Sequence, residues 1–82
     1  MTMQYLFFSQ IACTKCPGVR EFLKATGLQG KEINATDDEG FEEARKFKVM
    51  ATPTILLYDE NGNEIGRAVG LEELKELLKK NQ

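Results

Sequence analysis

The start of the chain switches from a strand pattern to a helix pattern and back. Met3–Phe8 (MQYLFF) is a short apolar run rich in aromatic residues, which is typical of a strand buried on both faces. The next segment repeats apolar residues at helical spacing and, with Pro17 near its start and Gly27 at its end, predicts a helix over about Thr14–Thr26. Lys31–Ala35 then predicts a second strand. Because a helical crossover joins the two strands, we expect them to lie parallel in one sheet.

The second half of the chain adds a helix, a hairpin and a last helix. Glu39–Phe47 has helical spacing, and the strands Thr54–Tyr58 and Glu64–Val69 flank Asn61-Gly62, a pair that supplies the positive φ angles of a tight hairpin turn. One face of the last helix carries leucines that we expect in the core, namely Leu71, Leu74, Leu77 and Leu78. The predicted order is β-α-β-α-β-β-α. This is an α/β fold, with a four-stranded mixed sheet flanked by three helices in a single domain over residues 1–82.

The composition argues against several classes of function. The 82 residues include no His, which removes the commonest zinc ligand and the commonest general base. Lys and Arg total 11 against 13 Asp and Glu, and no stretch is basic enough to follow a nucleic-acid backbone. The apolar run at the start is too short for a signal peptide or a membrane span. We therefore expect a cytoplasmic chain with neither nucleic-acid nor membrane partners.

Two cysteines, Cys13 and Cys16, lie at the junction between the first strand and the first helix. Their spacing on a first helical turn brings the sulfurs within bonding distance. The helix N-terminus presents partial positive charge there, and Lys15 adds a full charge, so both favour thiolate over thiol. A thiolate attacks a disulfide, and the second thiol then expels the product. The motif predicts a two-electron dithiol switch, although two core thiols or an inert structural disulfide remain possible from the spacing alone.

Several features of the chain occur together in a known family. They are the order of elements, the Cys-x-x-Cys between the first strand and the first helix, the run Ala51-Thr52-Pro53-Thr54 that opens the third strand, and Gly70 before the last helix. On these features the chain resembles the thioredoxin-like superfamily in its small, glutaredoxin-sized form. The resemblance covers almost the whole chain.

The resemblance implies a dithiol–disulfide oxidoreductase and a role for each site residue. Cys13 is expected to be the attacking cysteine, Cys16 the resolving one, and Pro53 a cis-proline facing the disulfide. Thr52 is expected to offer its backbone to an extended substrate, and Gly70 to border the same site. The implied partners are disulfide-containing proteins and an upstream flavin-dependent disulfide reductase. The chain is expected to be a monomer without a metal or another cofactor.

The chain also departs from the family pattern. Ala12 precedes the first cysteine where thioredoxins carry Trp, and Phe7 stands six residues before it where thioredoxins place a buried Asp. Two alternatives use the same cysteines, a Cu(I)-binding module and an iron–sulfur cluster bridged between two chains through Cys13. The loop acids Asp37, Asp38 and Glu39 are interpreted as helix caps and solvated charge rather than as a metal site.

Overall fold

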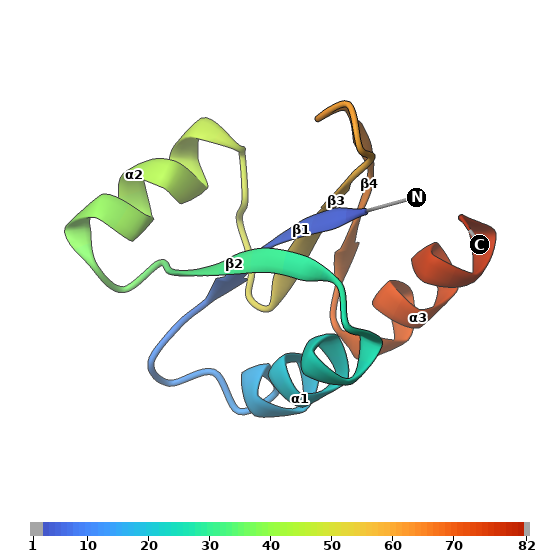
Figure 1. Cartoon of the computed structure of the whole chain (residues 1–82). Helices are drawn as coiled ribbons and strands as arrows, with labels where there is room; N and C mark the ends of the chain where they lie inside the picture. Colours follow the sequence, from blue (N-terminus) through green and yellow to red (C-terminus); the bar gives the residue numbers. More distant parts are fainter. Residues whose placement is uncertain (1–2, 82) are drawn as a thin grey trace.

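The sheet is built around β1 (Gln4–Ser9), which lies second in the strand order β2-β1-β3-β4 (Figure 1). The computed structural model describes residues 3–81. β2 (Gln29–Asn34) is parallel to β1, and β3 (Thr54–Tyr58) is antiparallel to it on the other side. β4 (Glu64–Val69) pairs antiparallel with β3. The predicted mixed sheet and its parallel pair are confirmed.

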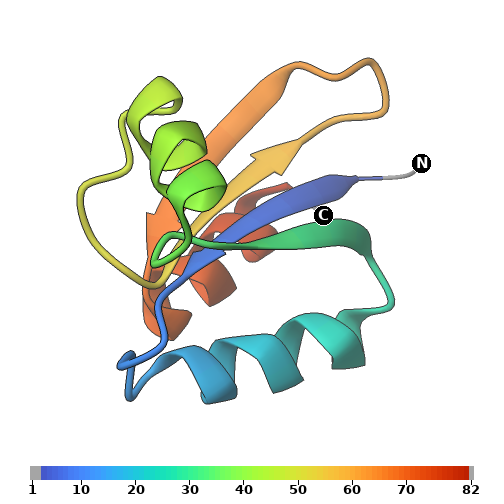
Figure 2. The ribbon, with the colours of Figure 1, turned by 90° about the vertical axis from the view of Figure 1, so that its left-hand side faces the viewer.

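Three helices cover the two faces of this sheet (Figures 1 and 2). α1 (Cys16–Thr26) and α3 (Leu71–Lys80) lie on one face, and α2 (Asp38–Lys46) lies on the other. Successive residues of β1 point to opposite faces, so Phe7 packs in the core under α1 and α3 while Phe8 packs in the core under α2. The leucine face of α3 packs against the first of these cores, and the element order is the predicted one.

α1 begins two residues later than the sequence pattern predicts, for a reason found in Pro17. A helix that started at Thr14 would need the N–H of residue 17 for its ladder, and proline has none. The observed start at Cys16 places Pro17 in the first turn, where N–H groups have no helical partner in any case. Cys13 lies in the loop ahead of the helix. Gly27, with φ 74°, ends the helix as predicted.

β2 begins at Gln29 rather than at Lys31, because its first residues pair with the start of β1. Gly30 stands opposite Tyr5 in the ladder, and a side chain at residue 30 would collide with the Tyr5 ring. The glycine that looked like a boundary in the sequence therefore belongs to the strand, where it leaves room for an aromatic ring.

The hairpin between β3 and β4 is a longer loop than the predicted tight turn. Gly62 has a positive φ of 84°, but Asn61 does not. The carboxylate of Asp59 instead accepts the backbone N–H groups of Asn61 and Asn63, each at 2.9 Å. These backbone donors lower the pKa of Asp59. The turn is thus organised by a side chain that mimics a backbone acceptor.

Among residues 3–81, none of the helices has the length and apolar character that a membrane crossing requires.

Candidate active site

One end of the sheet gathers the predicted site residues from distant parts of the chain. The end of β1 pairs with the start of β3 through Phe8 and Thr54, and Thr54 pairs in turn with Val69 at the end of β4. The Cys-x-x-Cys loop follows β1, Pro53 precedes β3, and Gly70 follows β4. Antiparallel pairing therefore brings these three segments to the same edge.

The two cysteines form a disulfide at the start of α1. Their Cα atoms are 5.4 Å apart, within the usual range for disulfides. Cys16 is the first residue of the helix and is 1% exposed, whereas Cys13 is only partly buried in the loop. The N–H of Cys13 donates to the Gln10 carbonyl oxygen at 3.2 Å, which closes a turn just before the motif. The two sulfurs thus belong to different environments although they are bonded to each other.

Lys15 lies between the cysteines, is exposed, and is the N-cap residue of α1. The first turn of the helix contains no acidic side chain. The partial positive charge of the helix start and the Lys15 ammonium are therefore not offset by an acid within that turn.

The peptide bond between Thr52 and Pro53 is cis, the isomer that the family resemblance implies. The Thr52 hydroxyl donates to the side-chain oxygen of Gln10 at 3.2 Å, so this loop is linked to the loop after β1. Within the part of the chain that the structure describes, no hydrogen bond is made by the backbone N–H or C=O of Thr52. Both groups are open to pairing with an extended segment.

Gly70 connects β4 to α3 in a left-handed backbone conformation, with φ 93°. Its N–H donates to the Pro53 carbonyl oxygen at 3.0 Å, and its own carbonyl accepts the Leu74 N–H at 3.1 Å. A Cβ at residue 70 would meet no atom within 4 Å. The backbone of Gly70 is therefore hydrogen-bonded to Pro53 and Leu74, and the absence of a side chain at Gly70 leaves open space beside it.

The loop after β1 carries an exposed apolar residue, Ile11, that was not among the predicted site residues. Ile11 is 83% exposed although it is large and apolar, and its N–H donates to the Thr36 hydroxyl at 3.1 Å. An isoleucine two residues before a reactive cysteine was the available signal, since loops more often carry polar residues at such places. Its exposure contributes apolar surface at this edge.

Cys16 lies in an apolar cluster with Phe7, the residue that replaces the expected Asp. Among the described residues, Ser9 and Thr54 are the only buried polar or charged side chains, so no buried carboxylate is available to exchange a proton with Cys16. Phe7 in place of the expected Asp therefore leaves Cys16 without a buried acid for proton exchange.

Arg20, one turn after Cys16 on α1, forms an ion pair. Its guanidinium is 2.7 Å from the Glu32 carboxylate on β2. The same carboxylate accepts the Ser9 hydroxyl at 2.8 Å. The hydrogen bond from Arg20, more than that from Ser9, lowers the pKa of Glu32. The pair ties α1 to the edge strand β2, beside the cysteine-bearing end of the helix.

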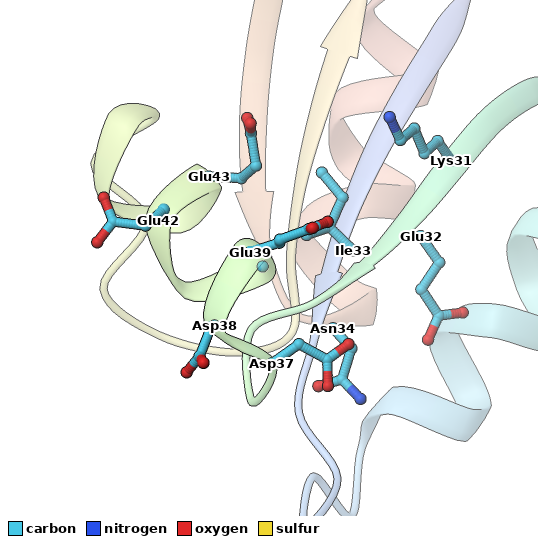
Figure 3. Close-up of a pocket in the computed structure, with 10 residues that line it drawn as sticks. Lys31, Glu32, Ile33, Asn34, Asp37, Asp38, Glu39, Glu42 and Glu43 are labelled. Carbon is cyan, nitrogen blue, oxygen red and sulfur yellow. The ribbon is translucent and has the colours of Figure 1, made fainter.

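The acids after β2 border a separate pocket of about 650 Å³ between β2 and α2. Figure 3 shows that their side chains diverge, with Asp38 and Glu42 pointing outward and Glu32 pointing toward α1. In residues 3–81, no group of three or more Cys, Asp or Glu side chains is placed to hold a metal ion. Asp37 is the N-cap residue of α2 but makes no side-chain cap bond, so these acids act through charge at the helix start.

Comparison with known proteins agrees with this fold and this site. The family model of the thioredoxin-like domain matches residues 3–82. The SPbeta prophage-derived thioredoxin-like protein YosR of Bacillus subtilis is 33% identical over 79 residues, which cover 94% of this chain and 96% of that protein.

Solved structures show the same likeness. Thioredoxin O2 of Arabidopsis thaliana in its oxidized state is 16% identical with a TM-score of 0.79, over 96% of this chain and 74% of that one. A thioredoxin from Thermus thermophilus is 29% identical with a TM-score of 0.67, over 98% of this chain and 74% of that one. The chain therefore belongs to the thioredoxin-like family, and its Cys13–Cys16 pair is that of a thiol–disulfide oxidoreductase.

Proposed function

We propose that the chain is a small cytoplasmic electron carrier that reduces disulfides in other proteins. The observation that carries the proposal is the unequal burial of the bonded cysteines: Cys13 is partly exposed in the loop and Cys16 is buried in the first helical turn. A substrate disulfide has access to Cys13 first. Cys16 is placed to complete the reaction from within the protein.

The reaction begins from the reduced dithiol. The Cys13 thiolate attacks one sulfur of a substrate disulfide, whose S–S bond breaks and leaves one substrate thiolate free. The resulting mixed disulfide is then attacked by the Cys16 thiolate at the Cys13 sulfur, which forms the intramolecular disulfide and releases the second substrate thiol. Two electrons pass from the protein to the substrate. A flavin-dependent disulfide reductase is the proposed donor that restores the dithiol.

Other residues of the edge are proposed to serve this exchange. Lys15 and the start of α1 stabilise the Cys13 thiolate by charge. The open backbone groups of Thr52 pair with an extended substrate segment, and Pro53 fills the space beside the disulfide. Gly70, lacking a side chain, leaves room for that segment. We propose that the chain works as one domain and as a monomer, without a metal or other cofactor and without nucleic-acid or membrane partners.

The test uses two single-cysteine variants, each incubated in reduced form with a disulfide-bonded protein such as insulin. Cys16→Ser is expected to accumulate a mixed disulfide through Cys13, because the resolving thiol is missing. Cys13→Ser is the matched control and is expected to trap almost none. Mass spectrometry of the intact adducts measures both. Equal trapping, or trapping by Cys13→Ser alone, contradicts the assignment of the two roles, and trapping by neither contradicts the oxidoreductase reaction and favours a metal-binding use of the pair.

A further inference from the structure

An apolar pocket opens directly beside the cysteine-bearing edge. It has a volume of about 550 Å³, and its large apolar lining residues, Phe41, Val49 and Met50, come from α2 and the segment that follows it. Phe41 is 55% exposed and Met50 is 97% exposed. Large apolar side chains held in contact with water around a pocket of this size are typical of a binding site.

The pocket is continuous with the proposed substrate site. Gln10 and Thr52 line it, and these two side chains are hydrogen-bonded to each other at 3.2 Å. The open backbone groups of Thr52 thus lie at the border between the pocket and the loop that carries Cys13. A substrate segment that pairs with the backbone of Thr52 therefore runs along the border of the pocket.

The charge of the pocket is positive. Arg45 and Lys48 line it, and none of its lining residues is acidic. Arg45 forms an ion pair at 3.2 Å with Glu42, and Glu42 does not line the pocket. Lys48 makes no ion pair with any residue in the range 3–81. An acidic group that enters this pocket meets an ammonium whose charge is not already compensated.

Lys48 also has an unusual backbone. Its φ is 58°, and it is the only residue other than glycine with a positive φ between residues 3 and 81. It closes α2 where glycine is the usual choice: its N–H bonds to the Arg45 carbonyl at 3.1 Å, and the next N–H bonds to the Ala44 carbonyl at 2.8 Å. A lysine is favoured by charge at the end of a helix but disfavoured by this backbone. Keeping a side chain there points to a use for it.

We propose that this pocket selects substrate proteins in which an apolar and an acidic residue lie next to the cysteine under attack. The apolar side chain packs against Phe41 and Met50, and the carboxylate pairs with Lys48. The inference rests on the proposed function, because it assigns the substrate class of that same exchange. The occupant is a segment of the substrate protein, and its acidic character follows from the charge of the pocket.

Three peptides test the selectivity. Each carries one cysteine in a disulfide with 2-mercaptoethanol, flanked on both sides by leucine and by either Glu, Gln or Lys. The reduced chain is mixed with each peptide, and the second-order rate of peptide reduction is measured in a single turnover. Each turnover converts the Cys13–Cys16 dithiol to the disulfide and releases the peptide thiol and 2-mercaptoethanol. We expect the Glu peptide to react roughly three- to tenfold faster than the Lys peptide, and the ratio to fall with added salt.

Three variants locate the preference. Lys48→Gly suits the left-handed backbone and removes the charge, so the Glu and Lys peptides are both expected to react at nearly the rate of the Gln peptide. In Lys48→Glu the Lys peptide is expected to react faster than the Glu peptide. Lys79→Glu makes the same change of charge at an exposed position near the end of α3 and is expected to keep the natural ratio. A Glu preference that survives in Lys48→Glu overturns the assignment of this pocket.

A neutral substrate separates this inference from the proposed function. Bis(2-hydroxyethyl) disulfide carries no charge and no side chain for the pocket. If the natural chain reduces it and reduces the three peptides at equal rates, the selectivity is refuted and the exchange reaction stands. If the natural chain reduces none of these disulfides, the proposed function itself is refuted.

Discussion

Cys13 and Cys16 show how a difference of one helical turn separates two chemical roles. The sequence correctly indicated that both cysteines lie at a helix start, and the helix that it predicts over about Thr14–Thr26 already leaves Cys13 outside. Pro17 shifts that start to Cys16, so one sulfur is in the loop and the other is under the helix. The proposed division of labour between attacking and resolving cysteine follows from these two environments.

Lys15 is expected to make Cys13 more reactive near neutral pH. With the helix start, its charge favours the thiolate, so alkylation of reduced Cys13 by iodoacetamide should have a midpoint below the value of about 8.5 for an ordinary thiol. Lys15→Glu should raise the midpoint by about half a pH unit. Lys24→Glu, at the other end of α1, is the control and should leave it almost unchanged. A natural midpoint near 8.5 contradicts the expectation.

The Glu32 carboxylate is expected to make the stability of the fold depend on pH in the acid range. Its pKa is lowered in the folded chain, chiefly by the hydrogen bond from Arg20, so the charged form stabilises the folded state. This contribution is present above the unfolded value of 4.5 and is lost as the pH falls through the lower folded pKa. Glu32→Gln should therefore lower the urea midpoint at pH 7 and lower it by a smaller amount at pH 3. If the urea midpoint fell equally at both pH values, the charge of the Glu32 carboxylate would not contribute to the stability.

At the scale of elements, the sequence predicted correctly those features that depend on neighbouring residues in the chain. Gly27 ended α1, short apolar runs placed β1 and β3 in the sheet, and the leucine face of α3 packed in the core. The start of β2 was missed because Gly30 looks like a boundary until the Tyr5 ring lies over it. Such contacts join residues far apart in the chain, and local patterns carry no record of them.

Gly40 and Gly18 are both helical glycines, but they should respond to alanine in opposite ways. A Cβ on Gly40 in α2 would fall on the carbonyl group of Asn34 at the end of β2, so Gly40→Ala should cost about 1–3 kcal/mol of unfolding free energy. A Cβ on Gly18 in α1 meets nothing within 4 Å, so Gly18→Ala should stabilise by up to about 1 kcal/mol. Urea unfolding of both oxidised variants measures the difference. A Gly40→Ala variant as stable as the natural chain would mean that α2 can move away from β2 without cost.

At the scale of the whole molecule, the site is one end of the sheet, where segments from distant parts of the chain meet, rather than a single sequence motif. The Cys-x-x-Cys and the Thr52-Pro53 pair were found in the sequence because each has a recognisable residue pattern. The residues proposed to select the substrate, Phe41 and Lys48, lie in a segment whose pattern indicates only a helix and its end. The return of the chain from α2 brings them into one pocket with Gln10 and Thr52, so their proposed role follows only from the fold.

The chain is expected to be a monomer although this end of the sheet exposes apolar surface. A twofold dimer would place the edge against its own copy, so Lys15, Arg45 and Lys48 would face the same cations. A stable interface also needs roughly 800 Å² from each partner, a large share of a total surface of 5528 Å². Sedimentation equilibrium at 0.15 M salt and about 100 μM protein should give the chain mass of 9.3 kDa in both redox states. Twice that mass would contradict the proposed monomer. If Met50→Ser then restored the single mass, this edge would be the interface, because that change removes the most exposed large apolar side chain of residues 3–81.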